Sequence, residues 1–381
     1  MIYLNCAATS IARPPCVGEA VCAALAGAGS AARGAAGEDL AAARLVFDAR
    51  CELARLFGFD HPERLVFTYN ATLALNQAIL GTVRRGDHVV ATAYEHNSVL
   101  RPLSFLARER DVAVDIIPVE PTGALDMAAA ERLITPGTRL VAISHASNLT
   151  GAVLPVARIA RLAHDAGALV LVDAAQTAGA LPVDWGELGA DLLAFTGHKA
   201  LMGPTGTGGL IVGPSVEVAP LVHGGTGVQS ALDDQPDAYP EHLEAGTLNT
   251  AGIAGLAAAA RFVASASPAS IHGRLRGLRA RLVEGLAAAR AVRVLGAHDG
   301  MEHLATVALT VGDLDAALVS DRLACDFGIV TRSGLHCAPR AHVALGTRER
   351  GAVRLSMGYY TTEAEVDRAV SALAAIAREE A

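Results

Sequence analysis

Short apolar runs alternate with longer helical stretches between about residues 65 and 212. The runs that we expect to form strands are 65–69, 88–93, 112–119, 140–144, 169–172, 192–195 and 209–212. The stretches that we expect to be helical are 71–83, 99–110, 127–133 and 156–166. Alternation of this kind favours an α/β architecture with a mostly parallel sheet. The run 169–172 is apolar on both faces, which is typical of a strand buried between two layers of helices.

The pattern changes after Gly246. We expect helices at 253–266, 275–289, 314–327 and 363–377, and strands at 292–295, 304–311 and 352–356. This mixture suits a smaller α+β domain. The chain is therefore predicted to have a large α/β domain over residues 18–255, and a small domain formed by residues 1–17 together with residues 256–381. A length of 381 residues is enough for two domains with a sizeable core.

The composition excludes several classes of protein. The chain has 31 Lys and Arg against 39 Asp and Glu, so a net charge of −8 argues against nucleic acid or an anionic membrane surface as the main partner. No apolar run reaches the ~20 residues that span a bilayer, and the N-terminus lacks a basic region followed by an apolar stretch. The six cysteines are scattered without a C-x-x-C pair, which argues against a disulfide framework or a metal site. We expect a cytoplasmic globular protein.

Lys199 is the only lysine among the 31 Lys and Arg residues. A compositional bias toward Arg explains most of that count, but it does not explain why one lysine remains. Arg carries charge as well as Lys does, yet it cannot offer a neutral amine for a Schiff base. Lys199 is therefore a candidate for amine chemistry, although a bias can also leave a stray residue.

The loops that follow the expected strands carry polar side chains, and in α/β folds such loops build the site. In chain order they contain Thr72, His96, Asn148, Asp173 and then Thr196, His198 and Lys199, with a glycine-rich stretch at 203–209. Singly, each has an ordinary explanation, such as a helix cap for Thr72 or a structural role for His96. Together they describe a pyridoxal phosphate site: a phosphate cradle, a ring-stacking His, a carboxylate for the pyridinium nitrogen and a Schiff-base lysine.

Three segments carry a family resemblance. They are Thr196-Gly197-His198-Lys199 with Gly203-Pro204-Thr205-Gly206, then Glu244-Ala245-Gly246-Thr247, and Arg332-Ser333-Gly334-Leu335-His336-Cys337-Ala338-Pro339. They resemble, in that order, the lysine motif, a later loop and the short-loop cysteine segment of the second group of cysteine desulfurases. These enzymes are class V aminotransferases of pyridoxal phosphate fold type I. They are similar to selenocysteine lyases. The likeness runs from Tyr3-Leu4 to Glu365-Val366-Asp367. It implies a large domain with a mostly parallel seven-stranded sheet and a smaller α+β domain.

The resemblance also implies roles for single residues. Lys199 would form the Schiff base and carry protons, and His96 would stack on the ring. The other cofactor-binding residues would be Thr72, Asp173, Gln176, Thr196, His198 and Thr247, and the substrate-binding residues would be Asn148, Arg332 and Arg354. Cys337 would receive the sulfur as a persulfide. His336 and Arg332 lie near it in the sequence, and such neighbours favour the thiolate.

The implied reaction converts L-cysteine to L-alanine and passes the sulfur from Cys337 to an acceptor protein. Thr247 would reach the phosphate of a neighbouring subunit, which implies a homodimer. Selenocysteine lyase activity on L-selenocysteine remains an alternative, as do transamination and β-elimination by the same kind of site. A ligand-sensing module is a further alternative, but we see no appended DNA-binding segment and the catalytic set is complete.

Three segments depart from the family pattern. Asn5-Cys6 precedes Ala7-Ala8-Thr9 where the family has an Asp-Asn or similar pair, which suggests a second cysteine near the mouth of the site. Thr72 is followed by Leu73 rather than by Glu. Ser30-Ala31-Ala32-Arg33 stands where the family often has an Asn-Pro-Gly-Arg segment followed by His. The last departure concerns the substrate loop and not the cofactor.

Overall fold

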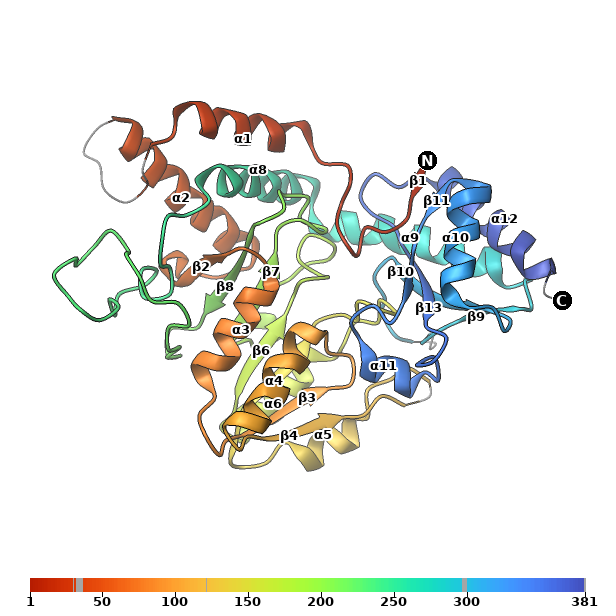
Figure 1. The fold of residues 1–381 in the computed structure, drawn as a ribbon, viewed down its shortest axis with the longest axis horizontal. Coiled ribbons are helices and arrows are strands. Elements are labelled where there is room, and N and C mark those ends of the chain that lie inside the picture. Colours follow the sequence, from red (N-terminus) through yellow and green to blue (C-terminus); the bar gives the residue numbers. More distant parts are fainter. Residues whose placement is uncertain (30, 32–36, 121, 297–299, 380–381) are drawn as a thin grey trace.

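The centre of the computed structural model, which describes residues 1–29, 31, 37–120, 122–296 and 300–379, is a sheet of seven strands in the order β2-β8-β7-β6-β5-β3-β4 (Figure 1). The strands are β2 (Leu65–Thr68), β3 (His88–Thr92), β4 (Ala113–Ile117), β5 (Thr138–Ser144), β6 (Leu169–Asp173), β7 (Leu192–Thr196) and β8 (Gly208–Val212). Neighbouring strands from β4 to β7 are parallel, whereas β8 is antiparallel to β7 and to β2. The predicted mostly parallel seven-stranded sheet is confirmed.

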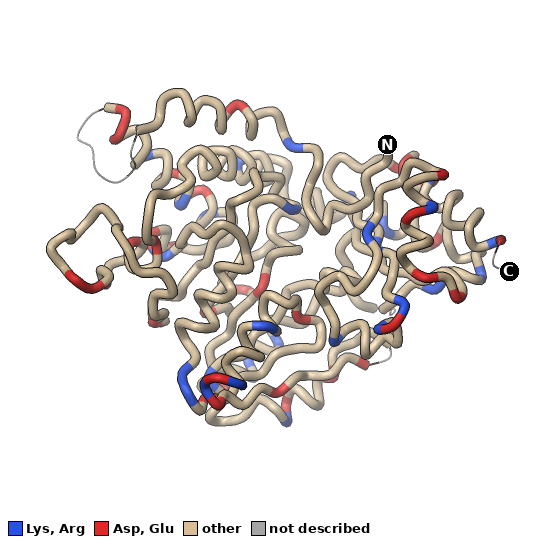
Figure 2. The backbone as a smooth tube through the Cα atoms, in the orientation of Figure 1, with Lys and Arg blue, Asp and Glu red and all other residues tan. Residues whose placement is uncertain are grey.

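Both faces of this sheet are buried. Along β6, Val170 and Val172 belong to one hydrophobic cluster and Leu171 to the other, because successive side chains of a strand point to opposite faces. The helices on one face are α3 (Ala71–Thr82) and α4 (Asn97–Glu109). Those on the other face are α2 (Gly37–Leu56), α5 (Met127–Leu133), α6 (Val156–Asp165) and α8 (Thr250–Ala266). Charged residues lie mostly in the outer helices and loops (Figure 2).

A second, smaller group of strands lies on the C-terminal side of the chain. Its antiparallel sheet has the order β12-β13-β10-β9, made of β12 (Arg332–Gly334), β13 (Ala352–Ser356), β10 (Thr306–Val311) and β9 (Val292–Val294). β1 (Ile2–Tyr3) pairs in parallel with β11 (Ile329–Val330), so the N-terminus joins this part (Figure 1). The helices here are α9 (Pro268–Leu286), α10 (Ala316–Phe327), α11 (Pro339–Ala344) and α12 (Glu363–Glu379).

The remaining elements are short or lie at the periphery: α1 (Pro15–Gly27), η1 (Pro62–Arg64) and α7 (Trp185–Leu188). The boundary predicted between residues 255 and 256 lies inside α8, and the division into two domains stays a prediction. Within the described ranges, no single helix is long and apolar enough to cross a membrane. Only α8 and α9 taken together have the length and apolar composition of a membrane span, and the pair is bent by 77°.

Sequence patterns missed β1, β11 and β12 because two or three residues are too few to show a period. They also placed the start of α9 too late. The helix begins at Pro268, which is suited to a first turn because the N–H that proline lacks has no partner there anyway. Of these misses, β12 matters most, because it carries one of the predicted site residues, Arg332.

Candidate active site

Three parallel strands end at the same edge of the sheet with a polar residue. β5 ends at Ser144, β6 at Asp173 and β7 at Thr196, and Ser144 is the register partner of Asp173. Asp173 Oδ1 accepts a hydrogen bond from the Ala175 N–H at 2.9 Å. Burial raises the pKa of the Asp173 carboxyl, while this hydrogen bond and the positive charge of Lys199 oppose the rise. The site therefore holds a buried carboxylate that is suited to a cationic partner.

Lys199 follows β7 in a tight turn that its neighbours hold in place. Its carbonyl accepts hydrogen bonds from Ser10 Oγ at 2.8 Å and from the Met202 N–H at 2.9 Å. The turn requires glycine at 197, because a Cβ there would collide with the Thr207 hydroxyl. Burial lowers the pKa of Lys199 to about 8, and the Asp173 carboxylate opposes that shift. The Lys199 amine is thus mostly protonated at neutral pH, but its neutral fraction is far larger than that of an exposed lysine.

His96 is fixed as a neutral ring at the start of α4. Its Nδ1 accepts the Ser98 N–H at 3.0 Å, so the ring proton lies on Nε2. Burial lowers the pKa of His96 to about 4, and the positive charges of Lys199 and Arg332 add to that effect. Ser98 Oγ lies 2.8 Å from His96 Nδ1 and 2.8 Å from Thr72 Oγ1, which links the ring to the first turn of α3. A flat, neutral imidazole suits stacking on a bound ring.

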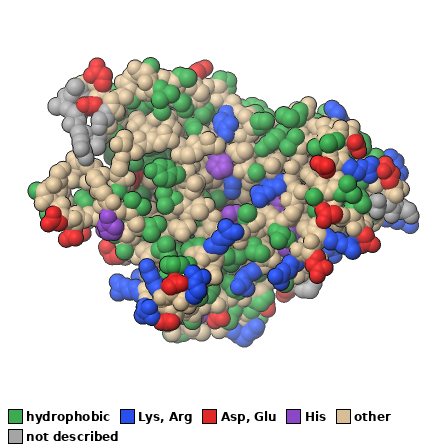
Figure 3. All heavy atoms as spheres, viewed as in Figure 1, with side chains coloured by type: hydrophobic (Ala, Val, Ile, Leu, Met, Phe, Trp, Pro, Cys, Tyr) green, Lys and Arg blue, Asp and Glu red, His purple; other side chains and the backbone are tan. Residues whose placement is uncertain are grey.

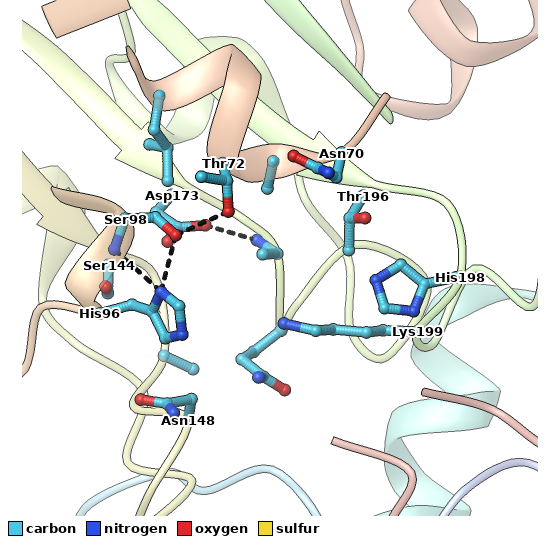
Figure 4. Close-up of a pocket in the computed structure, with 15 residues that line it drawn as sticks. Asn70, Thr72, His96, Ser98, Ser144, Asn148, Asp173, Thr196, His198 and Lys199 are labelled. Atoms are coloured by element: carbon cyan, nitrogen blue, oxygen red, sulfur yellow. Dashed lines mark hydrogen bonds between the residues drawn. The ribbon is translucent and has the colours of Figure 1, made fainter. Parts of the chain in front are cut away.

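The opposite side of the pocket is formed by the β7 loop. Figure 4 shows Thr196, His198 and Lys199 facing His96 and Asn148 across the opening. His198 Nδ1 lies 3.0 Å from Thr9 Oγ1, and burial lowers the pKa of this ring to about 4. Thr196 Oγ1 donates to the Thr207 carbonyl at 3.4 Å. Figure 3 shows His and Lys or Arg side chains gathered around the central hollow of this face.

One pocket brings together eight of the predicted residues. Those that line it are Thr72, His96, Asn148, Asp173, Gln176, Thr196, His198 and Lys199, and they are joined by Asn70, Ser98 and Ser144. The α3 N-terminus supplies backbone N–H groups without helical partners beside the hydroxyls of Thr72 and Ser98. A neutral amine, a buried carboxylate, a flat ring and this anion cradle are the groups that pyridoxal phosphate needs. The residues present fit that cofactor.

Arg354, on β13, is fully buried and has no carboxylate partner among the described residues. Its Nη1 donates to the Asn148 carbonyl at 2.8 Å and its Nη2 to Asn5 Oδ1 at 3.1 Å, but its Nε has no partner among those residues. Burial lowers the pKa of Arg354 to about 9. Asn148 Oδ1 is buried as well and has no hydrogen-bond partner in the described part of the chain. An unpaired donor on Arg354 and an unpaired acceptor on the neighbouring Asn148 suit an amino acid, which offers a carboxylate and an amine.

The cysteine loop is attached to this pocket by two hydrogen bonds that its backbone carbonyls accept. Asn148 Nδ2 donates to the His336 carbonyl at 2.6 Å, and the Asn97 N–H donates to the Cys337 carbonyl at 2.9 Å. Arg332 Nη2 lies 3.7 Å from Cys337 Sγ. Arg332 is the register partner of Arg354, so the loop and the buried arginine share one pair of strands. The fold therefore places a thiol next to the pocket of Lys199.

Three further predicted features are not among the residues that line this pocket. Thr247 is exposed and lines a separate groove with Tyr69 and Val222, so the described chain does not bring it to the pocket. Cys6 lines a cavity together with Lys199 and Gln176, and burial raises the pKa of the Cys6 thiol to about 12. Of the altered segment Ser30-Ala31-Ala32-Arg33, residues 30, 32 and 33 lie outside the described residues.

Sequence reasoning missed Ser98, Ser144 and the part played by Glu95. Glu95 is fully buried and accepts hydrogen bonds from Thr92 Oγ1 at 2.6 Å, from the Ser144 N–H at 2.9 Å and from Ser144 Oγ at 2.8 Å. Burial raises the pKa of Glu95 to about 7. The one available signal was a carboxylate in the short loop between a buried strand and the site histidine, immediately before that histidine.

Known proteins match the chain along almost its whole length. The family model "Aminotransferase class-V" matches residues 2–369. The "Probable cysteine desulfurase" of Methanothermobacter thermautotrophicus is 36% identical, over 88% of this chain and 84% of its own length. The "Cysteine desulfurase" of Cereibacter sphaeroides is 33% identical, over 88% of this chain and 86% of its own. The apo structure of the cysteine desulfurase from Thermococcus onnurineus superposes with a TM-score of 0.93 at 34% identity, covering 99% of this chain and 95% of that one.

Proposed function

The chain belongs to the class V aminotransferase family, and from that premise we propose that it is a pyridoxal phosphate-dependent cysteine desulfurase. The relatives at 33–36% identity that carry this name support the reaction type. The observation that carries the proposal is the position of Cys337. Its loop is hydrogen-bonded to Asn148 and Asn97, which adjoin the pocket of the sole lysine. Transamination would not need a thiol there.

Bound in the pocket, pyridoxal phosphate supplies an electron sink that weakens bonds at Cα and Cβ of an attached amino acid. Asp173 would hold a proton on the ring nitrogen, since a buried carboxylate favours a cationic partner. His96 would lie against the ring face as a neutral imidazole. Gln176, whose Nε2 donates to the Ala7 carbonyl at 3.2 Å, would approach the ring oxygen. Thr72, Thr196 and His198 would surround the phosphate.

Lys199 and Arg354 would handle the substrate. The Arg354 guanidinium, buried and without a carboxylate partner in the described part of the chain, would bind the substrate carboxylate together with Asn148, whose Nδ2 has a second N–H besides the one donated to His336. Lys199, whose pKa burial lowers to about 8, can accept a proton as the neutral amine and return it as the ammonium. Both residues thereby act at Cα, one by orienting the substrate and the other by moving its proton.

Cys337 would carry out the sulfur transfer. Its thiolate attacks the substrate sulfur, a sulfur–sulfur bond forms, and the Cβ–S bond breaks with its electron pair passing to the substrate carbon. L-cysteine plus the thiol thus yields L-alanine plus a persulfide, without any external oxidant. Arg332 Nη2, 3.7 Å from Sγ, offers a positive charge to the reacting sulfur. The persulfide would then pass to a sulfur-acceptor protein.

A single experiment separates the reaction classes. Purified protein loaded with cofactor is supplied with L-cysteine or L-selenocysteine, and alanine is assayed together with sulfide or selenide. We expect alanine from L-cysteine in step with persulfide on Cys337. Alanine from L-selenocysteine alone would make the protein a selenocysteine lyase. Pyruvate and ammonia in place of alanine would indicate β-elimination and overturn the proposal.

The assembly that we propose is a homodimer. Thr247 is exposed in a groove whose walls include the apolar side chains of Tyr69, Val222 and Leu248, and such a groove suits burial against a second copy. In that arrangement Thr247 would bind the cofactor phosphate in the site of the neighbouring subunit, as the family resemblance implies. Sedimentation at micromolar concentration tests this point, and a fully active monomer would contradict it.

A further inference from the structure

A row of buried polar side chains lies behind Cys337 and takes no part in the chemistry above. His336 Nε2 lies 3.1 Å from the Arg332 carbonyl, and His336 Nδ1 lies 3.5 Å from His342 Nε2. His342 Nδ1 lies 2.8 Å from Thr347 Oγ1. The two imidazole planes are nearly parallel, at 12°. His336, His342 and Thr347 are 2%, 0% and 4% exposed, so this row is shielded from water.

The direction of every hydrogen bond in the row is fixed by its first member. The Arg332 carbonyl can only accept, so His336 carries its proton on Nε2. Burial lowers the pKa of His336 to about 3 and that of His342 to about 4, so both rings are neutral. His336 Nδ1 must then accept from His342 Nε2, and His342 Nδ1 must accept from the Thr347 hydroxyl. The Thr347 hydroxyl is therefore a donor to His342 Nδ1, and it stabilises the His342 tautomer whose proton faces His336.

The loop that this row supports has an unfavourable backbone. His336 and Cys337 have φ values of +51° and +57°, a left-handed conformation that side chains with a Cβ rarely adopt. Two such residues in succession persist only where contacts over-determine them. The His336 carbonyl is held by Asn148 and the Cys337 carbonyl by Asn97, and the His336 ring provides a further attachment.

We infer that His342 and Thr347 are positioning residues that, through the His336 ring, hold the left-handed turn in which Cys337 Sγ lies against Arg332. The inference rests on the proposed function only in giving Cys337 the sulfur. Neither His342 nor Thr347 lines the pocket of Lys199. Their contribution is to the geometry of the thiol, and it should appear at the sulfur-transfer step and not in the binding of cofactor or substrate.

The decisive comparison is Thr347→Val against Thr347→Ser, both loaded with cofactor. Valine keeps the shape and removes the donor, whereas serine keeps the donor. A matched control is Thr138→Val: Thr138 is also buried, and its Oγ1 lies 3.0 Å from His88 Nδ1, but it begins β5 at the end opposite Ser144. It should lose stability to a similar degree without affecting the cysteine loop.

Two measurements are made on each variant. The first is amide hydrogen exchange of the peptide spanning residues 335–342, without substrate. The second is kcat and KM for alanine formation from L-cysteine. For Thr347→Val we expect exchange to rise and kcat to fall, each on the order of tenfold, because a buried acceptor loses its donor. KM and the cofactor absorbance should stay within about twofold, and Thr347→Ser should behave like the unaltered protein on the same scale.

The possible outcomes are distinct. Equal exchange in Thr347→Val and Thr347→Ser would overturn the inference. Faster exchange with an unchanged kcat would also overturn it, since the row would then be structural only. Slower turnover in Thr138→Val, to the same extent as in Thr347→Val, would show a general loss of stability and overturn it too. If the unaltered protein made no alanine, the proposed function would fail, and the exchange data alone would decide whether the row holds the loop.

Discussion

Arg332 lies directly opposite Arg354 in the antiparallel pair of β12 and β13. Burial is the main cause that lowers the pKa of Arg354 to about 9, and the positive charge of Arg332 adds to it. In the described chain, Arg354 donates hydrogen bonds to uncharged oxygens of Asn148 and Asn5. Two guanidinium groups in register, one of them fully buried, are unfavourable until an anion joins them. The arrangement is thus selective for a substrate with a carboxylate.

Arg354→Gln should weaken the binding of L-cysteine far more than that of the cofactor. A buried carboxylate that loses its charged partner costs on the order of 2–5 kcal/mol, so the apparent affinity should fall at least about thirtyfold. Titration of the cofactor absorbance with L-cysteine measures this. Arg281→Gln is the control, because Arg281 pairs with Asp367 on the surface, away from the site. An unchanged affinity in Arg354→Gln would remove this residue from the substrate site.

Lys199→Ala should leave the protein unable to form a borohydride-reducible adduct with pyridoxal phosphate. Because Lys199 is the only lysine, the remaining primary amine in the chain is that of the N-terminus. Mass spectrometry after reduction therefore gives a clean result. We expect one adduct on the peptide containing Lys199 in the unaltered protein and none in the variant. An adduct that persists elsewhere in the variant would contradict the assignment.

The rate at which cofactor-free protein takes up pyridoxal phosphate should rise with pH with a midpoint near pH 8, because the nucleophile is the neutral amine of Lys199. Burial lowers the pKa of Lys199 from the usual lysine value, so the neutral amine appears at lower pH than for an exposed lysine. Asp173→Asn removes the charge that favours the ammonium form. The midpoint should then move to still lower pH. A midpoint that stayed in place would show that Asp173 does not act on Lys199.

Arg50→Met should cost about 3–5 kcal/mol in the free energy of unfolding, measured by urea denaturation. Arg50 Nη1 donates to Glu244 Oε1 at 2.8 Å, both side chains are buried, and the same oxygen accepts the Phe67 N–H at 2.6 Å. The variant would leave the Glu244 carboxylate buried without its cation. Arg85→Met is the control, because Arg85 and Asp111 form an exposed pair, and its effect should be small. Similar losses in both variants would contradict this account.

The sequence predicted the parts of the site that follow locally from strand patterns. An apolar run that ends in one carboxylate located Asp173, and a lone lysine after a strand located Lys199. What it missed are the contacts between distant segments that hold these side chains in place. Asn5 reaches Arg354 across 349 positions, and Asn148 reaches His336 across 188. Ser98 matters only because α3 and α4 start side by side. Periodicity within a window carries no signal for such contacts.

Cys337→Ser separates desulfuration from the other reactions of the family. The change leaves Lys199, Asp173 and Arg354 in place, so the variant should bind the cofactor and still change its absorbance when L-cysteine is added. It should make almost no alanine from L-cysteine and carry no persulfide, because a serine hydroxyl does not attack sulfur. Turnover of L-selenocysteine should survive better, since a selenol leaves more readily.

Cys6→Ser is the matched control. Burial raises the pKa of the Cys6 thiol to about 12, so this thiol is protonated at neutral pH and is a poor nucleophile. Its loss should have a modest effect. Alanine formation from L-cysteine at the unaltered rate in Cys337→Ser would replace desulfuration by direct elimination or another class V reaction.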